Sequence, residues 1–133
     1  MKRKNLLDSF AILALLKEEN NYQFVLQILQ EARTGTRHLL MNEINAGEVY
    51  YQVVKRKLTK DLDRFWRTFL VLPIEFIGND FELVIEAAKI KSQYSISYAD
   101  CFAVATALKE GASLVTGDPE FKKVEKIVSI DWL

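Results

Sequence analysis

The sequence predicts an α/β sandwich built on a mostly parallel sheet. Short apolar segments with strand character alternate with longer segments of helical period along the chain, the pattern of strands joined by helices. Half of the 133 residues are hydrophobic, which is enough for a sizeable core in one domain. No internal repeat, low-complexity segment or linker interrupts this pattern, so residues 1–133 are expected to form a single domain.

Two strands and two helices are expected in the first third of the chain. A short strand over residues 4–8 ends at Asp8, and residues 10–16 follow it as an apolar helix. The next helix spans residues 22–33. Its buried side is expected to carry four apolar side chains: Phe24, Leu26, Ile28 and Leu29. Residues 37–41 then form a second strand.

A third helix is expected from Glu43 to about Lys57, after Asn42, which is a good N-cap residue. Spacings of three and four residues indicate an inner face of five positions: Ile44, Gly47, Tyr51, Val54 and Leu58. On this assignment Glu48 borders the inner face, where an unpaired carboxylate is costly. Periodicity does not choose between Glu48 and Glu43 as a functional acid, because Glu43 also has apolar neighbours one turn away.

An amphipathic helix over residues 59–70 opens the second half of the chain. Four basic residues follow one another at spacings of three and four: Lys57, Lys60, Arg64 and Arg67. Such a charged stripe is usually a solvated helix face. The functional alternative is a surface that contacts nucleic-acid phosphates. Lys122 and Lys123, close to Asp118 in the sequence, extend that second interpretation.

The most informative stretch lies after a third strand over residues 72–77 and a helix over residues 80–91. There Ser97 is expected to cap a helix that carries Asp100 in its first turn. This helix is apolar almost all round, which is typical of a buried helix, and Gly111 is expected to end it.

Two strands are expected near the end of the chain. Residues 112–115 form a buried central strand, and residues 127–130 form a last strand at the edge of the sheet. Asp118 lies in the turn after the central strand, beside Pro119. Aspartate is common in such turns, so Asp118 alone says little about function.

Three aspartates converge if the first and fourth strands are neighbours: Asp8, Asp100 and Asp118. A fourth acid can reach them from the helix of Glu43 and Glu48. Taken singly, Asp8 and Asp100 have ordinary uses in helix capping. Taken together, such carboxylates repel one another, and a hard divalent cation such as Mg²⁺ or Mn²⁺ relieves that repulsion. The chemistry expected of such a site is attack of a metal-activated water on a phosphodiester.

The composition excludes several other kinds of site. The single histidine, His38, rules out paired-histidine catalysis and a histidine-rich zinc site. The single cysteine, Cys101, rules out an internal disulfide and fits a reducing compartment. The net charge is zero, so any contact with nucleic acid must be local. Neither a signal peptide nor a membrane-spanning run is apparent, so we expect a cytoplasmic protein that does not contact a membrane.

The likeness to a known family rests on four segments: LLDS near the start, NAGEVYY in the middle, and ISYADCFAVATAL followed by LVTGDPEF. They resemble the PIN domain, and most of all the VapC-type toxin ribonucleases of prokaryotic toxin–antitoxin pairs. The resemblance runs from about residue 5 to the C-terminus, and the last two segments are the most specific. It implies a PIN-like three-layer α/β/α sandwich and a metal-dependent RNA endonuclease that uses Mg²⁺ or Mn²⁺.

The resemblance also implies which residues form the site. Four acids match the catalytic and metal-binding positions of the family: Asp8, Glu48, Asp100 and Asp118. The match therefore favours Glu48 over Glu43. Ser9 and Thr116 fall where family members often have small hydroxyl residues, whereas Phe10 is bulkier than the residue expected there. The resemblance further implies an RNA substrate, a cognate antitoxin and a homodimer.

Two other functions compete with this interpretation. A phospho-accepting receiver domain is also a small α/β domain with an acidic Mg²⁺ pocket. It requires paired acids after the first strand, and only Asp8 stands there. A non-catalytic PIN module that binds RNA or protein is the second alternative. Such modules typically lose acids, and all four are present in this chain.

Overall fold

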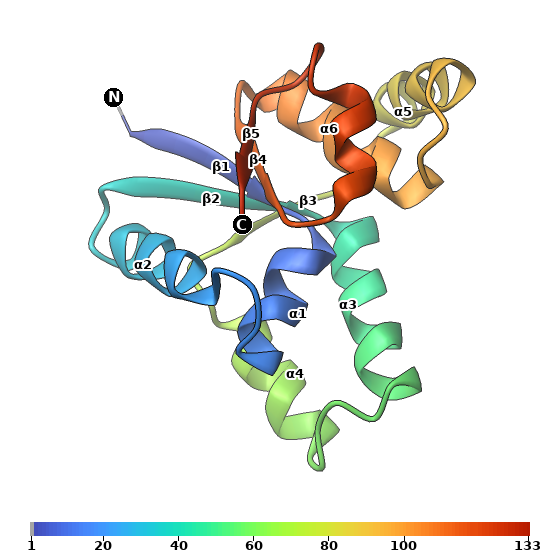
Figure 1. The fold of residues 1–133 in the computed structure, drawn as a ribbon. Helices are drawn as coiled ribbons and strands as arrows, with labels where there is room; N and C mark the ends of the chain where they lie inside the picture. The colour runs from blue at the N-terminus through green and yellow to red at the C-terminus, as the bar shows by residue number, and fades with distance from the viewer. Residues whose placement is uncertain (1) are drawn as a thin grey trace.

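A computed structural model describes residues 2–133 and contains a five-stranded sheet between two layers of helices (Figure 1). The strands are β1 (Arg3–Leu7), β2 (Arg37–Asn42), β3 (Glu75–Ile77), β4 (Ser113–Thr116) and β5 (Ile130–Trp132). The helices are α1 (Ser9–Lys17), α2 (Tyr22–Arg33), α3 (Glu43–Lys55), α4 (Leu62–Leu70), α5 (Phe81–Gln93) and α6 (Tyr98–Glu110), with a 3₁₀ helix η1 (Pro119–Val124). No helix within residues 2–133 has the length and apolar character needed to cross a membrane.

The strands are ordered β3-β2-β1-β4-β5, and each neighbouring pair is parallel. Leu6 of β1 lies opposite Leu40 of β2 on one side and Leu114 of β4 on the other. The first and fourth strands are thus central neighbours, as the convergence of the aspartates requires. From β1 the chain builds the sheet in one direction through β2 and β3 and in the other through β4 and β5. The carboxyl ends of β1 and β4 therefore form a topological switch point, where open parallel sheets bind ligands.

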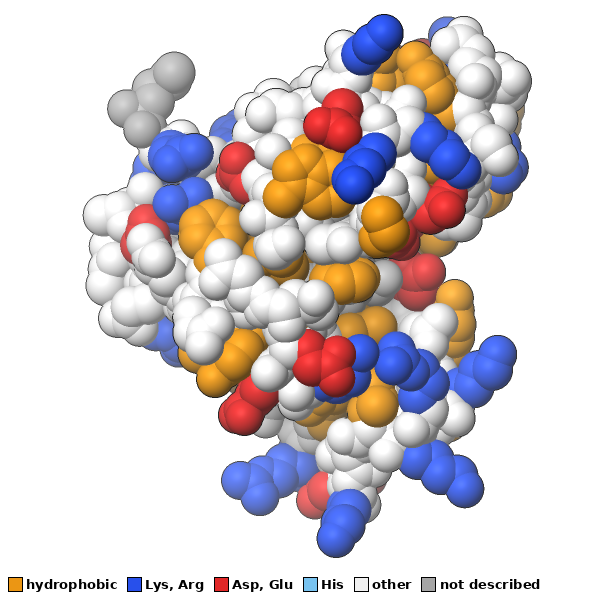
Figure 2. Space-filling model, in the orientation of Figure 1, with side chains coloured by type: hydrophobic (Ala, Val, Ile, Leu, Met, Phe, Trp, Pro, Cys, Tyr) orange, Lys and Arg blue, Asp and Glu red, His pale blue; other side chains and the backbone are white. Residues whose placement is uncertain are grey.

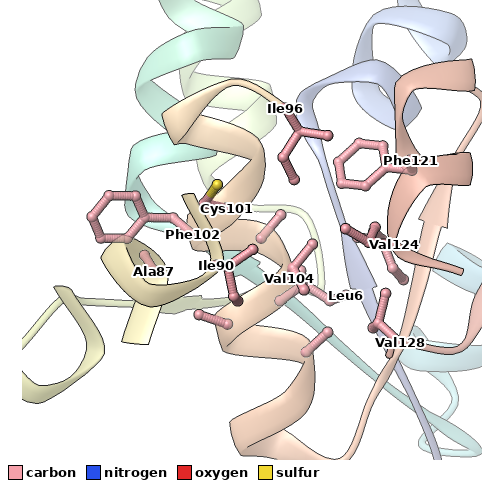
Figure 3. Close-up of a cluster of buried hydrophobic side chains, with 14 of the residues drawn as sticks. Leu6, Ala87, Ile90, Ile96, Cys101, Phe102, Val104, Phe121, Val124 and Val128 are labelled. Carbon is pink, nitrogen blue, oxygen red and sulfur yellow. The ribbon is translucent and has the colours of Figure 1, made fainter. Parts of the chain in front are cut away.

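Both faces of the sheet are buried, because successive side chains of a strand point to opposite faces. Leu6 contributes to a core shared with α5, α6 and η1, whereas Leu7 contributes to a core shared with α1–α4. Figure 3 shows the first core, in which Cys101 and Val104 of α6 lie among apolar side chains. The two cores make the fold a three-layer α/β/α sandwich, as predicted.

The caps of the central helices are those the sequence predicted. The Ser97 hydroxyl accepts a hydrogen bond from the backbone N–H of Asp100 at 3.1 Å and so begins α6. Gly111 ends α6 in the left-handed conformation with φ of 64°. At the start of α3, the side chain of Asn42 accepts a hydrogen bond from the N–H of Ile44 at 2.8 Å.

The predicted inner face of α3 is wrong at four of its five positions. Ile44, Gly47, Tyr51 and Val54 are exposed, whereas Leu58 lies beyond the end of the helix and packs against the core. The buried positions of the helix are Asn45, Ala46, Val49 and Val53. Apolar residues lie on two sides of α3, so a spacing of three and four residues fits either of them. A similar error affects α2, where Leu26 is exposed rather than buried and Val25 is buried instead.

Several predicted boundaries are also wrong. Lys57 lies just after the end of α3 and has a left-handed backbone conformation. The next helix, α4, begins only after Asp61, which is its N-cap. Lys57 and Lys60 therefore lie in a connection, and the four basic residues do not form one helical stripe. The third strand is shorter than predicted because it begins after Pro73, which has no N–H to donate. The last strand is at the sheet edge as predicted but runs over Ile130–Trp132.

Candidate active site

The four predicted acids line one pocket at the switch point of the sheet, and we call it the acidic pocket. Asp8 follows β1, Asp118 follows β4, and Asp100 lies in the first turn of α6. Glu48 reaches the same pocket from α3. Figure 2 shows carboxylates gathered in a hollow on the right of the molecule, between the surface over α6 and η1 and the surface over α1 and α3. Residues more than 100 positions apart in sequence thus share one site. This agrees with the prediction that the first and fourth strands are neighbours.

Asp8 is held in place on both of its carboxylate oxygens. The N–H of Ala11 donates to Oδ1 at 3.0 Å, so Asp8 caps α1, and the hydroxyl of Thr116 donates to Oδ2. Its side chain is only 2% exposed. The pKa of Asp8 is raised to about 8, mainly by burial; its hydrogen bonds with Thr116 and Ala11 oppose the rise, and the nearby charges of Asp100 and Asp118 contribute to it. The capping role and the place in the pocket thus coexist.

The backbone N–H of Asp100 donates to Ser97 in the cap of α6. Asp100 also lines the acidic pocket, where its surroundings disfavour a negative charge on the carboxylate. The pKa of Asp100 is raised to about 6, mainly by burial; a hydrogen bond with Ser97 opposes the rise, and three nearby charges contribute to it: Glu48, Asp118 and Glu120. A carboxylate that served only the helix dipole would lie in solvent at the helix end, and this one does not.

The structure separates Glu48 from Glu43, which the helix period could not do. The hydroxyl of Ser9 donates to Oε1 of Glu48 at 2.6 Å and fixes that carboxylate at the pocket wall. Glu43 points to a different groove, lined by aromatic residues such as Trp66. Its carboxylate lies only 2.7 Å from where a Cβ on Gly78 would stand.

Thr116 links the two strand ends that form the pocket. Its hydroxyl donates to Asp8 and accepts the N–H of Asp118 at 3.1 Å. Asp118 in turn accepts the N–H of Glu120 at 2.9 Å and caps η1. Phe10 packs so closely on Gly117 that a Cβ there would collide with its ring, which shows how this bulky residue is accommodated. The turn is therefore fixed from both sides.

Several residues of the pocket wall were missed by the sequence analysis. Glu120 adds a fifth carboxylate, two residues after Asp118. Gln52 and Arg56 line the pocket at intervals of four residues after Glu48, a spacing that would have indicated them had the phase of α3 been assigned correctly. The remaining missed residues of the wall are Leu13, Ser95, Ile96 and Ser97.

The basic residues predicted to contact RNA lie outside the acidic pocket. None of the six contributes to its wall within residues 2–133: Lys57, Lys60, Arg64, Arg67, Lys122 and Lys123. Lys123 donates to the carbonyl oxygen of Ser95 at 2.9 Å and pairs with Glu120 at 2.8 Å. It therefore ties η1 to the connection between α5 and α6.

The donor set of the acidic pocket suits a hard divalent cation in its chemistry. Carboxylate and hydroxyl oxygens are the ligands that Mg²⁺ and Mn²⁺ prefer, and the raised pKa values show carboxylates that need a compensating charge. As they stand, no three acidic, histidine or cysteine side chains within residues 2–133 are close enough to hold one ion. Coordination of one ion by several of these acids would therefore require their side chains to move closer together.

Comparison with known proteins gives one family and a set of similar folds. A PIN domain family model matches residues 6–127. No curated protein matches the chain. Among solved structures, a DNA-bound VapBC from Salmonella typhimurium is 18% identical with a TM-score of 0.75, covering 98% of this chain and 99% of that chain.

Two further structures show the same fold. VapC20 from Mycobacterium tuberculosis, described as a Sarcin-Ricin loop cleaving toxin, is 12% identical with a TM-score of 0.72, covering 97% of this chain and 99% of that chain. A toxin-antitoxin complex from Klebsiella pneumoniae is 15% identical with a TM-score of 0.71, again covering 97% and 99%.

Proposed function

The chain belongs to the PIN domain family, and on that premise we propose that it is a metal-dependent endoribonuclease that acts as the toxin of a toxin–antitoxin pair. The observation that carries the proposal is the convergence of Asp8, Glu48, Asp100 and Asp118 in one pocket. Four separate elements supply these acids, and a purely structural use of each would not bring them together. The similar fold of VapC20, which is described as a Sarcin-Ricin loop cleaving toxin, supports this proposal.

The four acids would hold Mg²⁺ or Mn²⁺ through their carboxylate oxygens. When bound, such an ion supplies an activated water and neutralises charge on the phosphate. The chain's own residues prepare the site for this chemistry. Thr116 orients Asp8 and Ser9 orients Glu48, so two carboxylates have fixed positions before a ligand arrives. At neutral pH Asp8, whose pKa is about 8, retains its proton in the free protein and would release it as the cation binds. Asp100, whose pKa is about 6, would do the same in mildly acidic solution.

The strand order argues against the receiver-domain alternative. Receiver domains of the flavodoxin-like type have the order 2-1-3-4-5, whereas this sheet has the order β3-β2-β1-β4-β5. Membership of the PIN domain family points the same way. A non-catalytic PIN module is the remaining alternative, and a test of activity separates it from the proposed nuclease.

The decisive experiment is incubation of the purified protein with a pool of cellular RNA, in Mg²⁺ and in EDTA. We expect new RNA ends in Mg²⁺ at a small set of sites, and none in EDTA. Mapping of the new 5′ and 3′ ends identifies the target in the same experiment. RNA that is bound but left intact in both Mg²⁺ and Mn²⁺ would favour the non-catalytic module.

A cognate antitoxin is the second proposed partner. The similar folds include a toxin-antitoxin complex, which supports this assignment. An acidic pocket with five carboxylates would attract a basic segment of such a protein. Co-purification of the chain with the small protein encoded beside it, together with loss of RNA cleavage in that complex, is the check.

A homodimer is the third proposal, and the exposed side of α3 supports it. Ile44, Tyr51 and Val54 form an apolar stripe on the surface, which is unfavourable in a monomer unless a partner covers it. We expect Val54→Asp to convert a dimer to a monomer in size-exclusion chromatography with light scattering. Leu26→Asp is the matched control, because Leu26 and Val54 are both 48% exposed and Leu26 lies on α2. A monomeric wild type, or equal effects of the two substitutions, would contradict this interface.

A further inference from the structure

The wall of the acidic pocket extends along one side of α3. Glu48, Gln52 and Arg56 line it at intervals of four residues, and side chains so spaced are neighbours on a helix surface. Residues 48 and 56 are eight positions apart, so their Cα atoms are about 12 Å apart at a rise of 1.5 Å per residue. The pocket is therefore an elongated site with its carboxylates at one end and Arg56 at the other.

Arg56 is the one basic residue in this wall within residues 2–133. The five carboxylates there are Asp8, Glu48, Asp100, Asp118 and Glu120. Although these acids lie nearby, the guanidinium makes no ion pair in the part of the chain that the structure describes. Figure 2 shows basic side chains over the lower part of the molecule, below the hollow that holds the acids. A cation at the rim of an acidic pocket is thus left free to bind an anion.

An anionic strand that enters this pocket meets repulsion from the acids before any chemistry occurs. A guanidinium at the far end of the pocket offsets that repulsion at one defined place. Arginine suits this task because its planar fork donates two parallel hydrogen bonds to one phosphate. Gln52 lies between the acids and Arg56, where its amide can meet the sugar or base that connects two phosphates.

We propose that Arg56 binds a backbone phosphate next to the one that is cleaved, and so fixes the register of the RNA strand in the acidic pocket. This inference rests on the proposed nuclease function. The competing explanation is structural, because Arg56 is the C-cap residue of α3 and a cation there also complements the helix dipole. Lys55, the last residue of the same helix, shares that dipole role but does not line the pocket. Lys55 therefore provides a matched control.

The first test compares Arg56→Gln, Arg56→Lys and Lys55→Gln with the wild type. RNA cleavage is measured in Mg²⁺, and binding of a short single-stranded RNA is measured in EDTA over a salt series. We expect Arg56→Gln to raise KM and Kd about tenfold with little change in kcat, since the lost contact is a charged hydrogen bond. The log–log salt slope of binding should fall by about 0.7 for one lost phosphate contact. Arg56→Lys should keep the slope and lose part of the affinity, and Lys55→Gln should resemble the wild type.

The second test locates the phosphate. RNA oligonucleotides carry one neutral methylphosphonate in turn at each position around the cleavage site, with a 2′-O-methyl sugar beside it for chemical stability. The losses of binding free energy caused by the methylphosphonate and by Arg56→Gln are compared with the loss when both changes are present. At one flanking position only, the combined loss should be smaller than the sum of the two, because both changes remove the same contact. Additive losses at every position would overturn the proposed contact.

The outcomes separate the inference from the function on which it rests. If the wild type cleaves RNA and Arg56→Gln behaves like Lys55→Gln, the nuclease stands and the role of Arg56 falls. If the wild type binds RNA with the expected slope change at Arg56 but does not cleave it, a phosphate contact of Arg56 stands, whereas the nuclease and the register relative to a cleaved phosphate both fall. If the wild type neither binds nor cleaves RNA, both fall.

Discussion

Replacement of Asp100 by Asn is expected to reduce RNA cleavage at least about 100-fold while the protein stays folded. The substitution removes a charge from the acidic pocket but keeps the shape of the side chain. The cap of α6 is retained, because the hydrogen bond to Ser97 comes from the backbone N–H of residue 100. Asp8→Asn should reduce cleavage by a similar factor, because it also removes a carboxylate from the acidic pocket. This variant should stay folded as well, since asparagine is a good N-cap for α1. Cleavage rates in Mg²⁺ and circular dichroism of the same samples are the measurements.

The sharpest control is a pair of glutamates on one helix. Glu48→Gln should lose activity, because Glu48 lines the acidic pocket and accepts from Ser9. Glu43→Gln makes the same chemical change on α3 but faces another groove, so it should keep most of its activity. An inactive Glu43→Gln beside an active Glu48→Gln would show that the site has been assigned to the wrong side of α3.

Growth of cells that express the protein gives the same variants a second readout. Expression of the wild type alone should slow growth if the chain is a toxin, and Asp100→Asn should relieve the effect. Wild-type protein that cleaves RNA in vitro yet leaves growth unchanged would contradict the toxin role and leave the nuclease intact.

The parts of the fold predicted well from the sequence are those with strong local signals. The predicted helix over residues 22–33 has the bounds of α2. The predicted caps also agree with the structure, because capping chemistry depends on neighbouring residues: Ser97, Asn42 and Gly111. The convergence of Asp8 and Asp118 was also predictable, since acids that follow neighbouring parallel strands meet at one edge of the sheet. The resemblance to the PIN domain placed Asp100 with them.

The features that were missed depend on tertiary contacts. α3 has apolar residues on two sides, and only packing into the core shared with α1, α2 and α4 decides that Val49 and Val53 are the buried ones. The wrong phase hid Gln52 and Arg56, which share the side of Glu48. Glu120 was missed because its place in the pocket depends on the 3₁₀ turn capped by Asp118.

The last prediction concerns the stability of the metal-free protein, which should fall as the pH rises. Asp8 and Asp100 have folded-state pKa values of about 8 and about 6, both above the usual value of 3.8. Below about pH 4 both states carry these protons, so the two groups have no effect on stability. Between about pH 4 and about pH 8 the unfolded chain loses protons that the folded protein retains, and the free energy of unfolding decreases. Above that window the loss is complete and constant.

Melting of three proteins in EDTA tests this prediction. The melting temperature of the wild type should fall by several degrees from mildly acidic to mildly alkaline pH, and Asp8→Asn and Asp100→Asn should each flatten that fall. At alkaline pH the two variants should be as stable as the wild type or more stable, because each removes a buried charge. If Asp100 served only the cap and dipole of α6, Asp100→Asn would instead cost between a few tenths and about 1 kcal/mol. The two explanations predict opposite signs.

Addition of Mg²⁺ at fixed ionic strength should reverse the order of stability. An ion that binds only the folded state stabilises it by RT ln(1 + [L]/Kd), so the melting temperature of the wild type should rise with Mg²⁺ concentration. The rise should be smaller in Asp8→Asn and Asp100→Asn, because each lacks a carboxylate that would hold the ion. The acids that destabilise the metal-free protein would then be the ones that stabilise the metal-bound protein, which is the behaviour of a binding site rather than of helix caps. A destabilised Asp100→Asn in EDTA with an undiminished response to Mg²⁺ would remove Asp100 from the metal site.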